Sequence, residues 1–216
     1  MGSLRRYTQL PALFYMLKGQ CITLLDPKSW DDRNDSYYLS VYRRRRNAQT
    51  VLALCFSEEG ETYHHWSVFA PGLGGVCIEF DADALTGAVE KQPGVRSGRV
   101  RYRTLKSSRG AKIAVSDLPF RKRLAFQDEK EFRVIYESKK DPIGSLDIQI
   151  PLSSIRRVVL SPWLPKTLGD EVKAVVRSID GCKTLKVYRS TLISNEEWKK
   201  VADNAVAKVK PARVAR

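Results

Sequence analysis

The side chains best suited to chemistry gather at Glu129, Glu131 and Arg133. In a strand these three residues share one face, while Phe132 takes the other face. Two carboxylates and a guanidinium are costly to bury without partners. One interpretation is an exposed sheet face with a cross-strand ion pair. The other is the polar floor of a catalytic site, where one carboxylate holds a sugar hydroxyl or stabilises a cationic transition state and Arg133 orients it.

A second cluster contains both histidines of the chain, in Tyr63-His64-His65-Trp66, with Phe69 three residues later. In an extended segment adjacent histidines point to opposite sides, so they are poor joint ligands for one metal ion. The spacing of Trp66 and Phe69 favours a short helical turn packed on the core. A histidine in this glycine-rich stretch could still carry a proton or contact a ligand.

Two acidic segments raise the question of a metal. The segment 31–35 offers three carboxylates and an amide, but it lacks the glycine and the distal glutamate of a calcium loop. Turn formation and helix capping explain it equally well. Asp117, followed by Asp128-Glu129-Lys130, loosely resembles the arrangement of a metal-dependent nuclease. We expect no metal site.

The chain is strongly basic: 38 lysines and arginines against 24 acids give a net charge of +14. Arginine forms one block at residues 43–46, and residues 96–112 carry seven bases and no acid. Such patches attract polyanions through counterion release. The sequence therefore predicts contact with nucleic acid or a ribonucleoprotein, through Arg43, Arg44, Arg45, Arg46, Arg101 and Arg103.

Composition indicates a folded protein. Of the 216 residues, 43% are hydrophobic and 29% are charged, which is typical of globular domains. The apolar runs are far too short to cross a membrane. The four cysteines are scattered, and most sit in apolar runs, which favours reduced core thiols in a cytoplasmic protein over a disulfide framework or a zinc site.

Hydrophobic periodicity and punctuation predict the elements that position these residues. We expect helices at 8–18, 36–46, part of 111–126, 167–179 and 195–209, with a short helix after Asp81. We expect strands at 21–25, 51–56, 75–80, 100–102, 132–136, 147–150, 157–160 and 185–188. Capping boxes at Thr167/Asp170 and Ser194/Glu197 start the last two helices. Residues 57–74 form a long connection.

These elements do not alternate strictly, which favours an α+β fold over a doubly wound parallel sheet. We expect a single domain over residues 1–193, with a mixed, mostly antiparallel sheet and flanking helices. A C-terminal amphipathic helix at 194–210 should pack on this domain, followed by a frayed basic tail at 211–216. The oligomeric state cannot be read from the pattern.

Several of these motifs, in this order, resemble the bacterial family catalogued as domain of unknown function 2971. The resemblance spans roughly residues 5–193. The matching pieces are Arg5-Arg6-Tyr7, Trp30-Asp31-Asp32, Cys55-Phe56-Ser57, the turn from Trp66 to Phe69, Gly75 to Asp81, Val100-Arg101-Tyr102, and Lys122 and Phe126 before Glu129-x-Glu131-Phe132-Arg133. The family usually has a methionine before that tryptophan and a His-Tyr pair after it. Here His65, Val68 and Phe69 stand there, so the tyrosine hydroxyl is absent.

The motif order is also similar to that of ADP-ribosyltransferases, and this weaker resemblance implies roles for individual residues. It implies NAD as the co-substrate, held by Arg6 and Tyr7 near the start of the chain. Ser57 would support the site and Trp66 would lie beside it. Glu131 would be catalytic with Glu129 aiding the acceptor, because cleavage of the glycosidic bond of NAD develops positive charge that a fixed carboxylate can stabilise.

Three functions therefore stay open. The first is an NAD-using transferase or glycohydrolase of a bacterial or phage conflict system, such as a toxin, acting on a nucleic-acid or ribosome-associated target. It requires Glu131 to lie in a cleft. The second is a non-catalytic basic module that binds nucleic acid or a protein partner. It requires the basic patches to converge on one face. The third is the metal-dependent nuclease.

Overall fold

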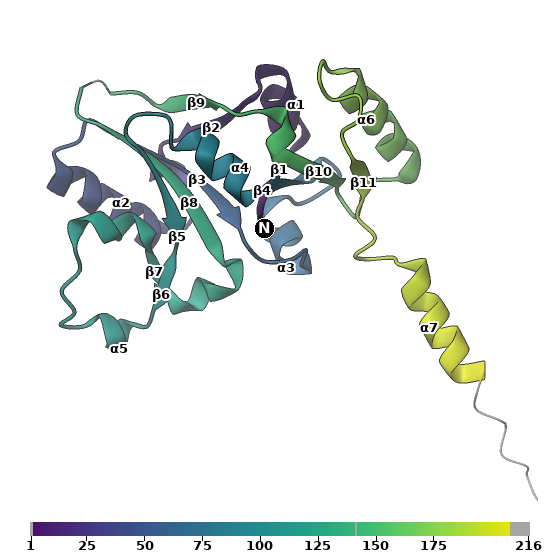
Figure 1. Cartoon of the computed structure of the whole chain (residues 1–216). Coiled ribbons are helices and arrows are strands. Elements are labelled where there is room, and N and C mark those ends of the chain that lie inside the picture. Colours follow the sequence, from purple (N-terminus) through teal and green to yellow (C-terminus); the bar gives the residue numbers. More distant parts are fainter. Residues whose placement is uncertain (1, 141, 208–216) are drawn as a thin grey trace, which may run out of the picture.

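The chain folds around a nine-stranded sheet, as the computed structural model in Figure 1 shows for residues 2–140 and 142–207. The strands follow the order β11-β10-β4-β1-β3-β2-β9, and β8 pairs with both β3 and β5. All these pairings are antiparallel except that of β10 with β11. The predicted α+β class with a mixed, mostly antiparallel sheet is confirmed.

The strands of the main sheet are β1 (Ser3–Gln9), β2 (Cys21–Leu25), β3 (Thr50–Ser57), β4 (Gly75–Asp81), β5 (Val95–Arg99), β8 (Glu131–Ser138), β9 (Ser145–Gln149), β10 (Ile155–Leu160) and β11 (Val187–Arg189). A separate two-stranded sheet consists of β6 (Arg101–Arg103) and β7 (Arg121–Arg123). The helices are α1 (Leu10–Gly19), α2 (Arg33–Arg46), α3 (Tyr63–Phe69), α4 (Ala82–Val89), α5 (Leu105–Ser108), α6 (Lys166–Ser178) and α7 (Glu196–Ala207). Short 3-10 turns are η1 (Pro27–Ser29), η2 (Val115–Phe120), η3 (Leu124–Glu129) and η4 (Leu152–Ser154).

Strand β3 is covered on both faces, which explains its continuous apolar run. Leu52 and Leu54 point into the main core, which also contains buried residues of α1 and α4. Val51 and Ala53 alternate with them and pack under α2, in a smaller cluster with Leu39. Because side chains alternate along a strand, one sequence feeds two layers. Packing on both faces therefore fixes β3 in place, and with it the residues at its end, such as Ser57.

The first strand was not predicted, although it lies in the centre of the sheet. Strand β1 pairs with β4 in register from Ser3 to Gln9. Only Leu4 and Tyr7 in it are buried, and two arginines interrupt the apolar pattern that would have identified a strand. The predicted helix at 8–18 consequently starts at Leu10 instead. This strand positions Arg6 and Tyr7.

Three stretches differ from the expected local structure. The connection at 57–74 contains helix α3, which includes the short turn expected at Trp66 to Phe69 and begins at Tyr63, so His64 and His65 lie on a helix and not on an extended segment. Residues 111–126 hold two 3-10 turns and the short strand β7, partly because Pro119 interrupts any longer helix. Strand β5 was missed because the Ser-Gly-Arg sequence within it resembles a turn.

The predicted capping boxes are not formed. Helix α6 begins at Lys166, with Pro165 at its N-cap and no capping side chain. In α7 the side chain of Asn195 accepts a hydrogen bond from the Trp198 backbone N–H at 2.9 Å.

Helix α7 does not pack on the domain as expected, but projects from it (Figure 1). The side chain of Trp198 is 76% exposed and that of Val201 is 59% exposed. The predicted frayed tail at 211–216 lies outside the described residues. No helix in the described ranges has the length and apolar character needed to span a membrane.

Candidate active site

A cavity of about 480 Å³ opens where strands β1 and β3 separate. The two strands form a single register pair, Arg5 with Ser57, whereas each is paired along its length with its other neighbour. Beyond this pair the Arg6 side chain enters the gap and donates to the Cys55 carbonyl at 3.1 Å. The cavity is lined by Arg5 to Gln9 of β1, Cys55 to Ser57 of β3, Ser29 to Asp32, Asp35, His65, Val68, Phe69, Lys122, Phe126, Glu129 and Glu131.

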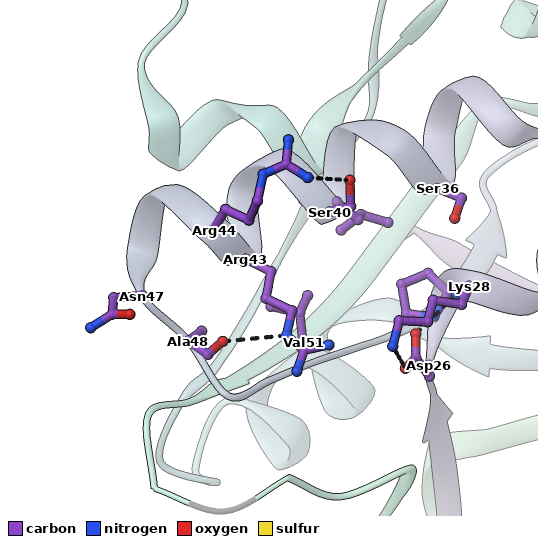
Figure 2. Close-up of a pocket in the computed structure, with 11 residues that line it drawn as sticks. Asp26, Lys28, Ser36, Ser40, Arg43, Arg44, Asn47, Ala48 and Val51 are labelled. Carbon is purple, nitrogen blue, oxygen red and sulfur yellow. Dashed lines mark hydrogen bonds and ion pairs between the residues drawn. The ribbon is translucent and has the colours of Figure 1, made fainter.

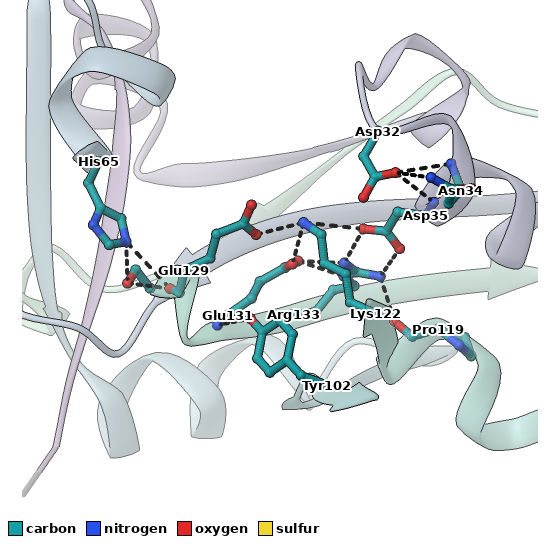
Figure 3. Close-up of polar contacts among 11 residues, drawn as sticks. Asp32, Asn34, Asp35, His65, Tyr102, Pro119, Lys122, Glu129, Glu131 and Arg133 are labelled. Atoms are coloured by element: carbon teal, nitrogen blue, oxygen red, sulfur yellow. Dashed lines mark hydrogen bonds and ion pairs between the residues drawn. The ribbon is translucent and has the colours of Figure 1, made fainter. Parts of the chain in front are cut away.

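The floor of this cavity is a buried cluster of charged side chains, shown in Figure 3. Lys122 lies between three carboxylates: its Nζ atom is 2.6 Å from Glu129 Oε2, 3.4 Å from Glu131 Oε2 and 3.7 Å from Asp35 Oδ2. Arg133 lies below and supplies the second cation. Three anions thus share two cations, and the carboxylates of Glu129, Glu131 and Asp35 line the cavity.

Arg133 is fully buried and ties three elements together. Its Nε donates to Glu131 Oε1 at 2.7 Å, and its two terminal nitrogens donate to the two oxygens of Asp35 at 2.9 and 2.6 Å. It also donates to the Pro119 carbonyl at 2.6 Å, and its guanidinium lies 5.0 Å from the centre of the Trp30 ring. Arg133 therefore orients Glu131 from beneath, and it is not among the residues that line the cavity.

The pKa values of the two glutamates of the floor shift in opposite directions. Burial alone would raise the pKa of Glu131, but Arg133 and Lys122 outweigh it and hold that pKa below its usual value. Burial dominates at Glu129 and raises its pKa, although Lys122 opposes it. The sequence analysis placed Glu129 on the strand with Glu131. It lies instead in η3, because Lys130 adopts a left-handed conformation (φ +40°) between them. An ionised carboxylate and a more basic one thus stand side by side.

Ser57 and His65 form a buried clamp beside the floor. Ser57 donates to the Glu129 carbonyl at 2.7 Å, accepts from the Glu59 N–H at 3.0 Å and lies 3.0 Å from His65 Nε2. Since its one proton is already used, Ser57 accepts from Nε2–H. The other ring nitrogen, Nδ1, then accepts from the Thr62 hydroxyl at 2.6 Å. Burial lowers the pKa of His65.

This arrangement defines what the clamp can do. His65 carries its proton on the nitrogen that faces Ser57, so it is not placed to remove a proton from that hydroxyl. Ser57 therefore holds the backbone before Glu131 in place through the Glu129 carbonyl; its role beside NAD, implied by the ADP-ribosyltransferase motif order, stays a prediction. The sequence pattern had indicated a histidine of this segment only as a proton carrier or ligand contact.

Tyr7 forms an aromatic side of the cavity. Its ring stacks on His65 with centroids 5.2 Å apart and meets Trp66 edge-on at 5.3 Å. Trp66 is fully buried behind Tyr7, does not line the cavity, and donates from Nε1 to Glu61 at 2.7 Å. Trp66, which the resemblance places beside the site, therefore presents no surface to this cavity. It supports Tyr7 instead, in agreement with the turn packed on the core.

The predicted basic residues do not converge. Arg43, Arg44, Arg45 and Arg46 end helix α2, where Arg46 pairs with Glu137 at 2.6 Å. Glu137 lies six positions along β8 from Glu131, or about 20 Å. This block borders a second cavity of about 460 Å³ with Lys28 and Asp26 at its rim (Figure 2). Arg101 and Arg103 lie on β6, next to the candidate site.

Three residues of the site were missed as functional groups. Lys122, Asp35 and Tyr102 come from elements far apart in the sequence, and Tyr102 Oη accepts a hydrogen bond from the Glu131 N–H at 2.8 Å. Lys122 carried a signal, since a basic residue precedes the Glu-x-Glu motif in the resembling family. Asp35 was noted only within the acidic segment 31–35, where turn formation and helix capping explain a carboxylate equally well.

The acidic segments are already engaged with cations and backbone groups. Asp32 caps α2 by accepting from the N–H groups of Asn34 and Asp35. Asp117 pairs with Arg101 at 3.8 Å and Arg121 at 3.5 Å. Within the described residues no group of three or more His, Cys, Asp or Glu side chains is arranged to hold a metal ion. The geometry gives the nuclease interpretation no support.

Cysteine positions agree with core thiols, apart from one. Cys21, Cys77 and Cys182 are buried, and all four cysteines are free. Cys55 is half-buried and lines the cavity next to Glu131. Burial raises the pKa of the Cys55 thiol well above its usual value, so this thiol stays protonated.

Comparison with known proteins gives one group of solved structures. No protein-family model and no curated protein sequence matches the chain. The structure of DarT from Thermus sp. 2.9 in complex with ADP-ribosylated ssDNA aligns with a TM-score of 0.46 at 10% identity, over 88% of this chain and 94% of that one. Those in complex with carba-NAD+ and NAD+ each give a TM-score of 0.44, at 11% and 10% identity.

Proposed function

We propose that the chain cleaves NAD and transfers its ADP-ribose group to an acceptor, with Glu131 as the catalytic carboxylate. The observation that carries the proposal is the state of Glu131. Its side chain is 4% exposed, it lines the floor of the cavity, and Arg133 and Lys122 lower its pKa. Burying an ionised carboxylate is costly, and in this position it faces a cavity and not the core.

The chemistry of the cavity walls fits NAD. The diphosphate of NAD is anionic, and Arg5 and Arg6 line the wall formed by β1. Its rings are aromatic, and Tyr7, Trp30 and Phe126 offer aromatic surface. The nicotinamide ring is cationic, and the floor is rich in carboxylates. Arg6 and Tyr7 would therefore hold the co-substrate, and Glu131 would face the ribose next to nicotinamide.

The proposed step breaks one bond and forms one. The bond between the ribose C1′ and the nicotinamide nitrogen breaks, and its electron pair leaves with neutral nicotinamide. Positive charge develops on the ribose, and the fixed carboxylate of Glu131 stabilises it without reorganising. An acceptor atom then bonds to C1′ and loses a proton. Burial raises the pKa of Glu129, which makes this neighbouring carboxylate the group suited to take that proton.

Two observations favour this function over the non-catalytic basic module. A module that works by charge alone requires its basic patches on one face, yet the α2 block and β6 lie apart along β8. It also requires no cavity around the carboxylates. We extend the proposal to a nucleic-acid or ribosome-associated acceptor because of the net charge of +14. A role in a conflict system stays a prediction from the family resemblance.

The test is NAD turnover by Glu131→Gln, followed as nicotinamide release in the presence of a nucleic-acid-rich lysate. The amide keeps the shape and removes the charge, so we expect a loss of about 100-fold or more, with binding of uncleavable carba-NAD retained. Glu137→Gln is the matched control, since it changes the same residue type on the same strand outside the cavity. Equal turnover by wild type and Glu131→Gln would contradict the proposal, as would no turnover by the wild type.

A further inference from the structure

The segment from Val100 to Arg123 is the most basic part of the chain, with eight lysines and arginines against the single acid Asp117. It contains the two-stranded sheet in which β6 and β7 run parallel. Arg101 pairs with Arg121, Tyr102 with Lys122, and Arg103 with Arg123. Because paired residues in adjacent strands share a face, the central pair points one way and the four arginines point the other way.

The inward face of this small sheet touches the candidate active site. Tyr102 accepts from the Glu131 N–H at 2.8 Å, and Lys122 donates to Glu129 at 2.6 Å. The segment from Val100 to Arg123 makes two further contacts with β8, the strand that carries Glu131. The Val100 N–H donates to the Glu131 carbonyl at 2.8 Å, and the Pro119 carbonyl accepts from Arg133 at 2.6 Å. The position of β6 and β7 and that of the catalytic carboxylate are therefore linked.

The outward face presents what we call the arginine array: Arg101, Arg103, Arg121 and Arg123. Neighbours along each strand are about 6.6 Å apart and neighbours across the strands about 4.8 Å. Arg103 and Arg123 are exposed, and the side chain of Arg101 is 64% exposed. Asp117 pairs with Arg101 and Arg121 at the other end of the array. Four guanidinium groups thus share one carboxylate. The side chain of Arg121 is 18% exposed, so the surplus of positive charge at the surface lies on Arg101, Arg103 and Arg123.

We propose that the arginine array binds the phosphodiester backbone of a nucleic-acid strand, and that this binding raises the affinity of the cavity for NAD through Tyr102 and Lys122. A guanidinium group binds two phosphate oxygens through a pair of parallel hydrogen bonds. The backbone of a nucleic acid presents phosphate groups at regular intervals. A nucleic-acid strand bound to the array would lie outside the cavity. The array would therefore regulate the candidate active site whichever molecule accepts the ADP-ribose.

The coupling follows from the alternation of side chains. A nucleic-acid strand bound to the arginine array restrains β6 and β7. These two β-strands carry Tyr102 and Lys122, which contact Glu131 and Glu129. Ordering these side chains before NAD arrives removes part of the entropy that NAD binding would otherwise cost. Coupling between two binding sites is reciprocal, so NAD would raise the affinity for the strand by the same factor. The coupling to NAD binding rests on the proposed function, whereas the binding of nucleic acid by the array does not.

The array is tested by fluorescence anisotropy with labelled 20-nucleotide single-stranded DNA and RNA, titrated at several salt concentrations. Arg103→Gln/Arg123→Gln should weaken binding and reduce the slope of log affinity against log salt by about two. Arg44→Gln/Arg45→Gln on α2 is the matched control, with the same loss of charge at exposed positions, and should leave the slope almost unchanged. A reduced slope in the α2 variant together with an unchanged slope in Arg103→Gln/Arg123→Gln would overturn the proposal that the array binds nucleic acid. A difference in affinity between the DNA and the RNA oligonucleotide would identify which nucleic acid the array binds.

The coupling is tested by titrating carba-NAD with and without saturating oligonucleotide. Wild type should bind carba-NAD more tightly when the oligonucleotide is present. Tyr102→Phe removes the acceptor of the Glu131 N–H, so it should bind the oligonucleotide normally and lose this enhancement. An oligonucleotide that leaves the affinity of the wild type for carba-NAD unchanged would overturn the coupling. If carba-NAD binds under no condition, the proposed function fails, while the anisotropy result on the array still stands.

Discussion

At the scale of single residues, the floor carboxylates differ in their pKa although all of them contact Lys122. Only Glu131 among Glu129, Glu131 and Asp35 keeps a lowered pKa. At Glu131 the cations Arg133 and Lys122 outweigh burial, whereas at Glu129 burial outweighs Lys122. At Asp35 burial outweighs both cations and raises the pKa. The site therefore separates two adjacent glutamates into an ionised group and a more basic one.

The pH profile of NAD turnover should report this arrangement. With Glu131 as the proposed catalytic carboxylate, activity would require its ionised form, so a lowered pKa should preserve turnover into acidic solution, and turnover should fall as pH drops through that pKa. Lys122→Met removes an opposing cation from a buried carboxylate, which raises its pKa. The acidic limb of the profile should move to higher pH, while Lys122→Arg should restore it. An unmoved limb in Lys122→Met would show that Glu131 does not control the rate.

At the scale of elements, Arg133 is the junction of β8, α2 and η2. It joins Glu131, Asp35 and the Pro119 carbonyl, and none of these contacts is exposed to water. Removing one partner of a buried ion pair leaves the other charges without compensation. The junction should therefore contribute to the stability of the fold as well as to the position of Glu131.

Urea unfolding of Arg133→Met measures this contribution. We expect the free energy of unfolding to fall by about 3–5 kcal/mol, because Asp35, Glu131 and Glu129 stay buried with Lys122 as the single cation of the cluster. Arg99→Met is the matched control on the neighbouring strand β5, since Arg99 pairs with Glu58 but its side chain is 76% exposed. It should cost at most about 1 kcal/mol. Equal effects of the two substitutions would show that the junction is not a stabilising element.

The elements also show how far the sequence leads. The Glu-x-Glu-x-Arg stretch was predicted as a possible site floor, because alternation alone places Glu131 and Arg133 on one face, and the strand before Ser57 was predicted from its apolar run. Strand β1 was not predicted, since two of its seven residues are arginines that enter the cavity or its edge. Residues at a functional site break the apolar pattern from which strands are recognised.

The partners of the site could not be predicted for a different reason. Asp35, Tyr102 and Lys122 reach Glu131 or its neighbours from α2, β6 and β7, which lie between 9 and 96 residues away along the chain. Periodicity reports which face of an element is apolar, and it does not report which elements meet. The separation of the two arginine clusters is likewise a property of the folded chain, set by the direction of α2 and β8.

At the scale of the whole molecule, the domain ends before helix α7. Every residue from Thr191 to Ala205 is exposed, so none of this stretch is buried against the sheet or its helices. The helix is held by its own contacts: Glu196 pairs with Lys199 at 2.7 Å and Glu197 with Lys200 at 2.9 Å. Such local pairs stabilise a helix by a few tenths of a kcal/mol and need no support from the domain.

Deleting residues 196–216 should therefore leave the stability of the domain unchanged. Stability from apolar burial scales with the area removed from water, and Trp198 and Val201 remain largely in water. In urea unfolding followed by circular dichroism, we expect the same midpoint and the same m-value for the full chain and for residues 1–195, because m scales with the surface exposed on unfolding. A lower midpoint together with a smaller m-value would mean that α7 buries apolar surface on the domain, as its amphipathic sequence first suggested.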